Sequence, residues 1–126
     1  MSVTERTSVR TFLIADIRGY SRYTEECGDE AAAALAKRFA EIVDEDVAAH
    51  DGELVEMRGD EALVVFTSAR QAIRAAVDLQ AQFQEAARDF DIPPRVGIGI
   101  DSGEAVQLAE GSFRGDLYHR LSVFGL

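Results

Sequence analysis

Hydrophobic residues in the first part of the chain form a strand pattern followed by a helix pattern. An apolar run over residues 10–17 is rich in strand-forming side chains, and residues 18–21 end it with a turn. A helical pattern follows, with Ser21 as its expected N-cap and a break at residues 27–28. Apolar side chains then recur at three- and four-residue spacing along one helix face: Leu35, Phe39, Ile42, Val43 and Val47.

The helix is expected to end shortly before a hairpin. Gly52 supplies the expected stop, and His50 is expected to be a favourable charge at the helix C-terminus. Residues 53–57 and 62–66 then predict two strands, and the tight turn signal between them predicts that they form a hairpin.

The second half of the chain repeats the order of helix and strand. Residues 69–90 predict a helix that ends before Pro93 and Pro94, and its expected buried side consists of Ile73, Val77, Phe83, Ala87 and Phe90. Alternation over residues 95–101 predicts a fourth strand, and residues 103–109 are expected to add a fifth.

The order of these elements is β-α-β-β-α-β, which predicts an α+β fold of the ferredoxin-like type. A right-handed crossover makes the first two strands parallel, and the third strand then lies between them. The carboxyl end of the first strand and the hairpin turn therefore lie at the same edge of the sheet. Asp16 ends that strand and Asp60 lies in that turn, so the two carboxylates are predicted neighbours.

Composition and charge narrow the classes of function. The 126 residues suit a single domain, and the formal net charge of −10 with Lys37 as the only lysine argues against nucleic-acid binding. No P-loop occurs, so a bound nucleoside triphosphate would require a divalent metal. Apolar runs are too short for a membrane span, no secretory signal is seen, and Cys27 is the only cysteine, which together predict a cytoplasmic protein.

Neighbouring carboxylates suggest metal chemistry. Two carboxylates about 4 Å apart repel by roughly 4 kcal/mol at an effective dielectric near 20, and a proton or a cation relieves that repulsion. Hard oxygen ligands with the main-chain carbonyl of Ile17 suit Mg²⁺ or Mn²⁺, and the turn before the first helix offers backbone N–H groups to phosphate. The alternative is structural, because a strand-end Asp is often a cap and Gly-Asp is ordinary turn chemistry.

Three segments resemble the motifs of one family. Residues 12–21 resemble the first metal motif of class III adenylate and guanylate cyclases, residues 54–66 resemble the second, and residues 95–104 resemble their Gly-rich strand and turn. The likeness runs from about Val9 to Gly115. It divides the chain into a short lead (1–8), a cyclase-type domain (9–115) and a divergent tail (116–126), and it implies the class III cyclase catalytic fold, incomplete at its C-terminal end.

The resemblance implies a site, a reaction and an assembly. It makes Asp16 and Asp60 the catalytic metal ligands of two Mg²⁺ or Mn²⁺ ions, with Ile17 adding its carbonyl. The implied reaction converts ATP or GTP to a 3′,5′-cyclic nucleotide and pyrophosphate, in cyclic-nucleotide signalling, within homodimers or heterodimers whose sites use both chains. The residues implied in substrate binding are Arg18, Gly19, Tyr20, Ser21 and Glu56.

Departures from the family pattern leave alternatives. Glu56 replaces the base-selecting lysine, as in guanylate cyclases, whereas Ser112 at the second base position supports neither base. His119 and Val123 stand where the family has the Asn and Arg that act on ribose and phosphate. We therefore expect the chain alone to be a weak cyclase or none. The alternatives are a non-catalytic dimerisation or nucleotide-sensing module, and the metal-donating half of a heterodimer.

Two further patterns point elsewhere. Residues 58–62 also resemble the hairpin signature of diguanylate cyclases, but the pattern that this family carries after its first strand is not seen. Gly97 and Gly99 lie inside an alternating strand and do not open a helix, which is a poor dinucleotide fingerprint. The class III cyclase resemblance therefore remains the principal interpretation.

Overall fold

The computed structural model describes residues 5–90 and 94–108, with only the backbone described for residues 5–7 and 105–108. Its elements run in the predicted order, with the first helical stretch divided in two at Gly28 as the sequence predicts. They are β1 (Glu5–Arg18), α1 (Tyr20–Cys27), α2 (Asp29–Ala49), β2 (Glu53–Arg58), β3 (Glu61–Phe66), α3 (Ala69–Ala87) and β4 (Arg95–Leu108). Within these residues, no helix combines the length and apolar character that a membrane span requires.

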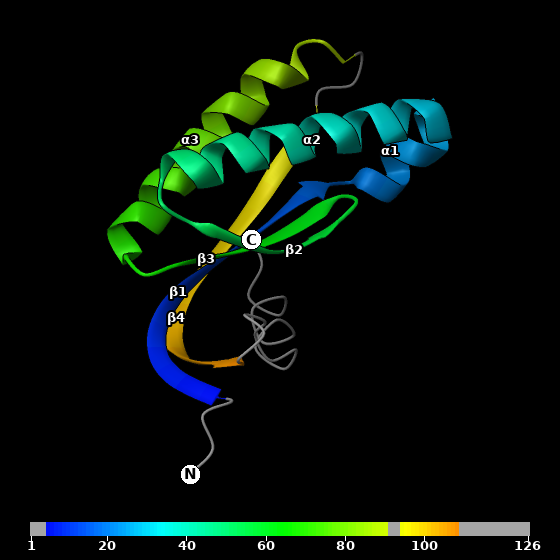
Figure 1. Cartoon of the computed structure of the whole chain (residues 1–126). Coiled ribbons are helices and arrows are strands. Elements are labelled where there is room, and N and C mark those ends of the chain that lie inside the picture. Colours follow the sequence, from blue (N-terminus) through cyan, green and yellow to red (C-terminus); the bar gives the residue numbers. More distant parts are fainter. Residues whose placement is uncertain (1–4, 91–93, 109–126) are drawn as a thin grey trace.

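The four strands form one sheet in the order β2-β3-β1-β4. Every neighbouring pair is antiparallel, so β1 and β2 are parallel to each other with β3 between them. This is the ferredoxin-like arrangement predicted from the element order. The described helices lie together over one face of the sheet (Figure 1).

The outer strands are longer than the sequence pattern predicts. β1 begins at Glu5 rather than residue 10, so that residues 5–8 of the expected lead lie in the strand. β4 continues without a break to Leu108, so the prediction of a separate fifth strand is wrong. The reason is the pairing of β1 with β4, which is continuous from Arg18–Arg95 to Glu5–Leu108. The last residues of β4 therefore hydrogen-bond to the first residues of β1 and do not form a separate strand. This pair runs on beyond β3 (Figure 1).

The main core lies between the sheet and the helices. The apolar stripe predicted on α2 is buried as expected, and Phe39 at its centre meets Phe83 of α3 edge to face, with ring centroids 5.9 Å apart. Burying such large side chains supplies the main driving force for folding. The α2 residues in this core are Ala32, Leu35, Phe39, Ile42, Val43 and Val47.

The buried face of α3 differs from the predicted one. Phe83 and Ala87 are buried as predicted, whereas Ile73 and Val77 are 56% and 64% exposed, and the helix ends at Ala87 rather than Phe90. Small side chains occupy most of the buried stripe and allow α3 to approach its neighbours closely, so the large aliphatic residues do not mark the core face. The buried residues of α3 are Ala72, Ala75, Leu79, Phe83, Ala86 and Ala87.

Position 52, shortly after the end of α2 at Ala49 and its C-cap His50, requires glycine for a reason other than backbone freedom. The residue with positive φ at this helix end is Asp51, at 57°, whereas Gly52 lies against the ring of Phe66. A Cβ at Gly52 would stand 2.6 Å from Phe66 Cε1, and Phe66 is a core residue with 2% exposure. The glycine is therefore needed for close approach.

Replacing Gly52 by alanine should destabilise the fold. The added methyl group forces a buried aromatic ring to move, which typically costs about 1–3 kcal/mol. Urea unfolding measures this cost, and Asp51→Gly is the matched comparison because it relieves a positive φ and should be neutral or slightly stabilising. Equal midpoints for Gly52→Ala and the unchanged chain would contradict the close approach.

Candidate metal centre

Asp16 and Asp60 meet at one edge of the sheet, as their places in the sequence predict. Asp16 lies near the end of β1, and Asp60 lies in the tight turn between β2 and β3. The backbone N–H of Ile17 donates a hydrogen bond to the backbone oxygen of Asp60 at 2.9 Å. The predicted proximity of the two residues is confirmed, and their role as metal ligands stays a prediction.

Strand register places further acidic residues beside Asp16. Glu61 is its direct partner on β3, and paired residues of antiparallel strands point to the same face of a sheet. The same register pairs Leu63 of β3 with Ile14 of β1 and with Glu56 of β2. Asp16, Glu61 and Glu56 therefore share the face that lies away from the main core.

A small apolar cluster occupies this same face, next to the acidic edge. Its buried members are separate from the main core between the sheet and the helices, since alternate residues of β1 and β3 point to opposite sides. The acidic edge thus lies at the end of an apolar strip formed by Phe12, Ile14, Leu63 and Val65, with Val55 packed against them.

The electrostatics of the edge disfavour a second negative charge. Burial raises the pKa of Asp16 above its ordinary value, and the neighbouring Asp60 adds to this, while Arg18 and a hydrogen bond from the Gly97 backbone oppose it. Asp16 Oδ1 is buried and has no hydrogen-bond partner. The nearest compensation is an ion pair with Arg18 Nε at 3.4 Å, so this oxygen is under-satisfied.

Glu61 is a member of this edge that motif reasoning missed. Burial raises its pKa, the charges of Asp16 and Asp60 raise it further, and Arg58 opposes them. The signal was available in the sequence, since Glu61 directly follows Asp60 and opens the strand that pairs with β1. The edge therefore carries three acidic side chains whose charges repel one another.

The turn after β1 presents a helix N-terminus near this edge. Gly19, and not the predicted Ser21, is the N-cap of α1, with φ of 69° in the left-handed region that glycine adopts readily. The Tyr20 hydroxyl donates to the Ala32 backbone oxygen at 3.0 Å and so fastens α1 to α2. The hydroxyl of Tyr20 is therefore committed to the fold, while the backbone N–H groups of the first turn are donors that this segment offers to a ligand.

Glu56 is held by a neighbour on its own strand. Its Oε1 accepts a hydrogen bond from Arg58 Nε at 2.9 Å, and both side chains are partly exposed. The carboxylate is therefore oriented and still reachable. Several residues weighed in the sequence lie outside the described residues: Ser112, His119, Val123 and the whole of the expected tail, 116–126.

Oxygen donors at this edge fit a divalent cation. Asp16 has a buried oxygen without a hydrogen-bond partner, and Asp60 lies beside it. A bound positive charge would lower both the free-energy cost of the buried negative charge and the repulsion between the two carboxylates. Hard oxygen ligands of this kind suit Mg²⁺ or Mn²⁺. Elsewhere among the described residues, on α2 and α3, three side chains have ligand atoms within 4.8 Å of one another: Asp46, His50 and Asp78.

Over most of this chain, the sequence is similar to that of one curated protein. No protein-family model matches the chain. It is 33% identical over 99 residues to a putative adenylate cyclase 3 of Rhizobium meliloti (strain 1021). That alignment covers 75% of this chain and 17% of the relative, so this chain spans about a sixth of the protein it matches.

Solved structures share the fold at low sequence identity. A bacterial light-regulated adenylyl cyclase superposes with a TM-score of 0.84 at 19% identity, over 97% of this chain and 40% of that one. The guanylyl cyclase Cya2 gives a TM-score of 0.81 at 20% identity, over 98% of this chain and 74% of that one. The fold predicted from the sequence resemblance is confirmed.

Proposed function

The chain has the fold of the class III nucleotide cyclase catalytic domains, and from that premise we propose that it binds a nucleoside triphosphate through divalent metal at the Asp16–Asp60 edge and takes part in its cyclisation. The observation that carries this proposal is the pair itself: two carboxylates brought together by the fold, one with a buried oxygen that lacks a hydrogen-bond partner. A fold gains no stability from the repulsion of two carboxylates unless a proton or a cation relieves it.

Asp16, Asp60 and the carbonyl oxygen of Ile17 would hold Mg²⁺ or Mn²⁺. Two such ions, when bound, stabilise charge on the attacking and leaving oxygens of a phosphoryl displacement. In the proposed reaction the ribose 3′-oxygen forms a bond to the α-phosphorus and loses its proton, and the bond from that phosphorus to pyrophosphate breaks. Asp16 and Asp60 act here by fixing the position of the triphosphate.

Other residues of the edge would bind the rest of the substrate. The first backbone N–H groups of α1, from Tyr20 and Ser21, would receive phosphate oxygens because a helix N-terminus favours negative charge. Arg18 would exchange its ion pair with Asp16 for a phosphate contact once metal neutralises that carboxylate. Glu56, oriented by Arg58, accepts hydrogen bonds and so favours a base edge that donates them.

A second chain would complete the site. This chain would supply the metal half of a dimeric site, and the partner would supply the groups that stabilise the transferring phosphate, which are worth roughly 10³-fold or more in phosphoryl transfer. The chain alone is then expected to be a weak cyclase, and a complete cyclase domain is the expected partner. The alternative is a non-catalytic module that binds metal and nucleotide without turnover.

Purified protein with Mn²⁺ and either ATP or GTP tests the proposal. We expect nucleotide binding that requires the metal, measured by calorimetry, and slow formation of a 3′,5′-cyclic nucleotide, measured by chromatography and increased by a complete homologous cyclase domain. Binding without product in both conditions would favour the non-catalytic module. No metal-dependent binding of either nucleotide would overturn the proposal altogether.

A further inference from the structure

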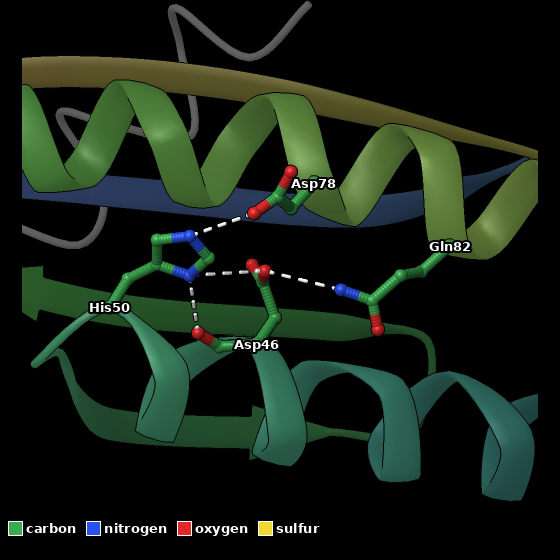
Figure 2. Close-up of polar contacts among 4 residues, drawn as sticks. All are labelled: Asp46, His50, Asp78 and Gln82. Atoms are coloured by element: carbon green, nitrogen blue, oxygen red, sulfur yellow. Dashed lines mark hydrogen bonds and ion pairs between the residues drawn. The ribbon is translucent and has the colours of Figure 1, made fainter.

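A second cluster of titratable side chains joins α2 to α3, apart from the Asp16–Asp60 edge. Asp46 lies in the last turns of α2 and His50 is its C-cap, while Asp78 and Gln82 face them from α3 (Figure 2). Asp46 is buried, with 3% of its side chain exposed, and 12% of the His50 side chain is exposed. Charged side chains are rarely buried unless they are paired. This pair therefore either stabilises the packing of the two helices or changes its charge with the pH.

Both ring nitrogens of His50 face acceptors. Nδ1 lies 2.8 Å from the backbone oxygen of Asp46 and 3.3 Å from its carboxylate Oδ1. Nε2 lies 2.8 Å from Asp78 Oδ2. A carbonyl and an ionised carboxylate only accept hydrogen bonds, so a short contact at each nitrogen requires a proton on each. The geometry is therefore that of the imidazolium form, with one hydrogen bond to each helix.

Loss of the proton would leave an unfavourable contact. A neutral imidazole keeps one N–H, so the lone pair of the other nitrogen would face an acceptor, either the carboxylate of Asp78 at Nε2 or the backbone oxygen of Asp46 at Nδ1. Asp46 would also lose its cationic neighbour while buried, keeping only the amide of Gln82, which donates to Oδ1 at 3.4 Å. The link between the helices therefore depends on one proton.

We propose that His50 is a proton-dependent clip between α2 and α3, formed in its cationic state and released when the ring loses its proton. The clip binds a proton rather than a metal ion, because its two nitrogens are directed to acceptors on opposite sides of the ring and Nδ1 is already occupied by a backbone oxygen (Figure 2). The groups that face the ring from the two helices are Asp46 and Asp78.

The direction of the pH effect follows from the contacts. The hydrogen bond to the Asp46 backbone oxygen raises the pKa of His50, burial opposes it, and the charges of Asp46 and Asp78 raise it further. The folded chain thus holds the proton more tightly than the unfolded chain. The stability that the clip contributes is fully present below the ordinary imidazole pKa of about 6.5, and it is lost as the pH rises through the higher folded value.

Asp46 adds to this effect in the same direction. Burial, with the nearby charge of Asp78, raises its pKa to about 6, while His50 opposes that shift. An ionised Asp46 is a cost to the folded state that develops as the pH rises from about 4 to about 6. The imidazolium of His50 offsets that cost, so deprotonation of His50 above this range removes the compensation from a carboxylate that is already charged.

Titration of the His50 ring by NMR, in the whole chain with a chelator present, tests the clip. We expect a midpoint above 6.5 for wild type and a lower one for Asp78→Asn, which keeps an acceptor but removes the charge. Asp44→Asn, an exposed acid on the same helix, is the matched control and should leave the midpoint unchanged. A midpoint at or below 6.5, or one that ignores Asp78→Asn, would overturn the proposal.

Stability gives an independent readout. The urea midpoint of wild type should fall between pH 7 and pH 9, and this fall should shrink in His50→Gln, whose side chain does not titrate. The same fall in both proteins would contradict the clip. Added Zn²⁺ should neither raise the midpoint nor shift the ring signals of His50, and if micromolar Zn²⁺ did both, a metal site would replace the clip as the interpretation.

Discussion

Replacing Asp16 by asparagine should abolish metal-dependent binding of a nucleoside triphosphate and yet make the metal-free chain more stable. Asparagine keeps the shape of the side chain but removes the charge that burial and Asp60 disfavour. Changes in groups that merely support metal ligands cost 10–100-fold in metal affinity, so loss of a direct ligand should cost about 100-fold or more. Calorimetric titration with Mn²⁺ and nucleotide measures the loss of binding.

The gain in stability comes from linkage between protonation and folding. Asp16 and Glu61 have raised pKa values, so the folded chain binds their protons more tightly than the unfolded chain, and the metal-free protein becomes more stable as the pH falls through those values. Asp16→Asn should therefore raise the urea midpoint at pH 7 and weaken its dependence on acid pH. Glu61→Gln should do the same with a smaller loss of metal binding.

A matched control separates this effect from a general effect of charge. Asp44→Asn removes an exposed acid from α2 and should change neither the midpoint nor metal binding by much. Mn²⁺ should raise the melting temperature of the control and of wild type by mass action, but not that of Asp16→Asn. An Asp16→Asn protein that still gained stability from Mn²⁺ would show that the metal binds elsewhere.

Replacing Phe39 by alanine should destabilise the fold by about 3–5 kcal/mol, the usual cost of removing a buried aromatic ring. Phe39 is fully buried at the centre of the α2 stripe and meets Phe83 of α3 edge to face. The substitution removes contacts to both the sheet and α3 and leaves a cavity between them. Since small domains are stable by only about 5–15 kcal/mol, the loss is a large share of the total.

Val77→Ala is the matched control for Phe39→Ala, because it truncates an exposed side chain instead of a buried one. Val77 is a large aliphatic residue on α3, but it is 64% exposed, and its truncation should change the free energy of unfolding by less than about 0.5 kcal/mol. Urea unfolding of both variants measures the difference. A cost for Val77→Ala near that of Phe39→Ala would mean that α3 buries the face first predicted from its sequence.

The sequence predicted the fold where its pattern was unambiguous. The α2 stripe is large, apolar and regular, so its buried face followed from spacing alone. On α3 the core face is mostly alanine, and hydrophobicity by itself cannot distinguish a small buried residue from a small exposed one. The length of β4 also escaped prediction, because the partner that extends it, residues 5–10 of β1, is distant in the chain.

The candidate site followed from topology rather than from any single residue. Asp16 and Asp60 were predicted neighbours because the crossover fixes which strand ends meet, and the backbone hydrogen bond between Ile17 and Asp60 agrees. Glu61 was missed because it was treated as part of a turn, although it pairs directly with Asp16. The contact of His50 with α3 could not be predicted from the sequence. It depends on which face of α3 packs toward α2, and the hydrophobic pattern assigned part of that face incorrectly.

The central place of β1 has a consequence for how the protein is made. β1 leaves the ribosome before any other strand, but its neighbours β3 and β4 follow much later, and its farthest pair joins Glu5 to Leu108. At roughly 5–20 residues per second, synthesis of the intervening chain takes on the order of several seconds. Until β3 is made, the apolar segment that carries Asp16 is unpaired on both edges, and its edge toward β4 stays unpaired longer. The strand that carries Asp16 is therefore also a nascent segment whose unpaired edges favour aggregation, the hazard against which chaperones act.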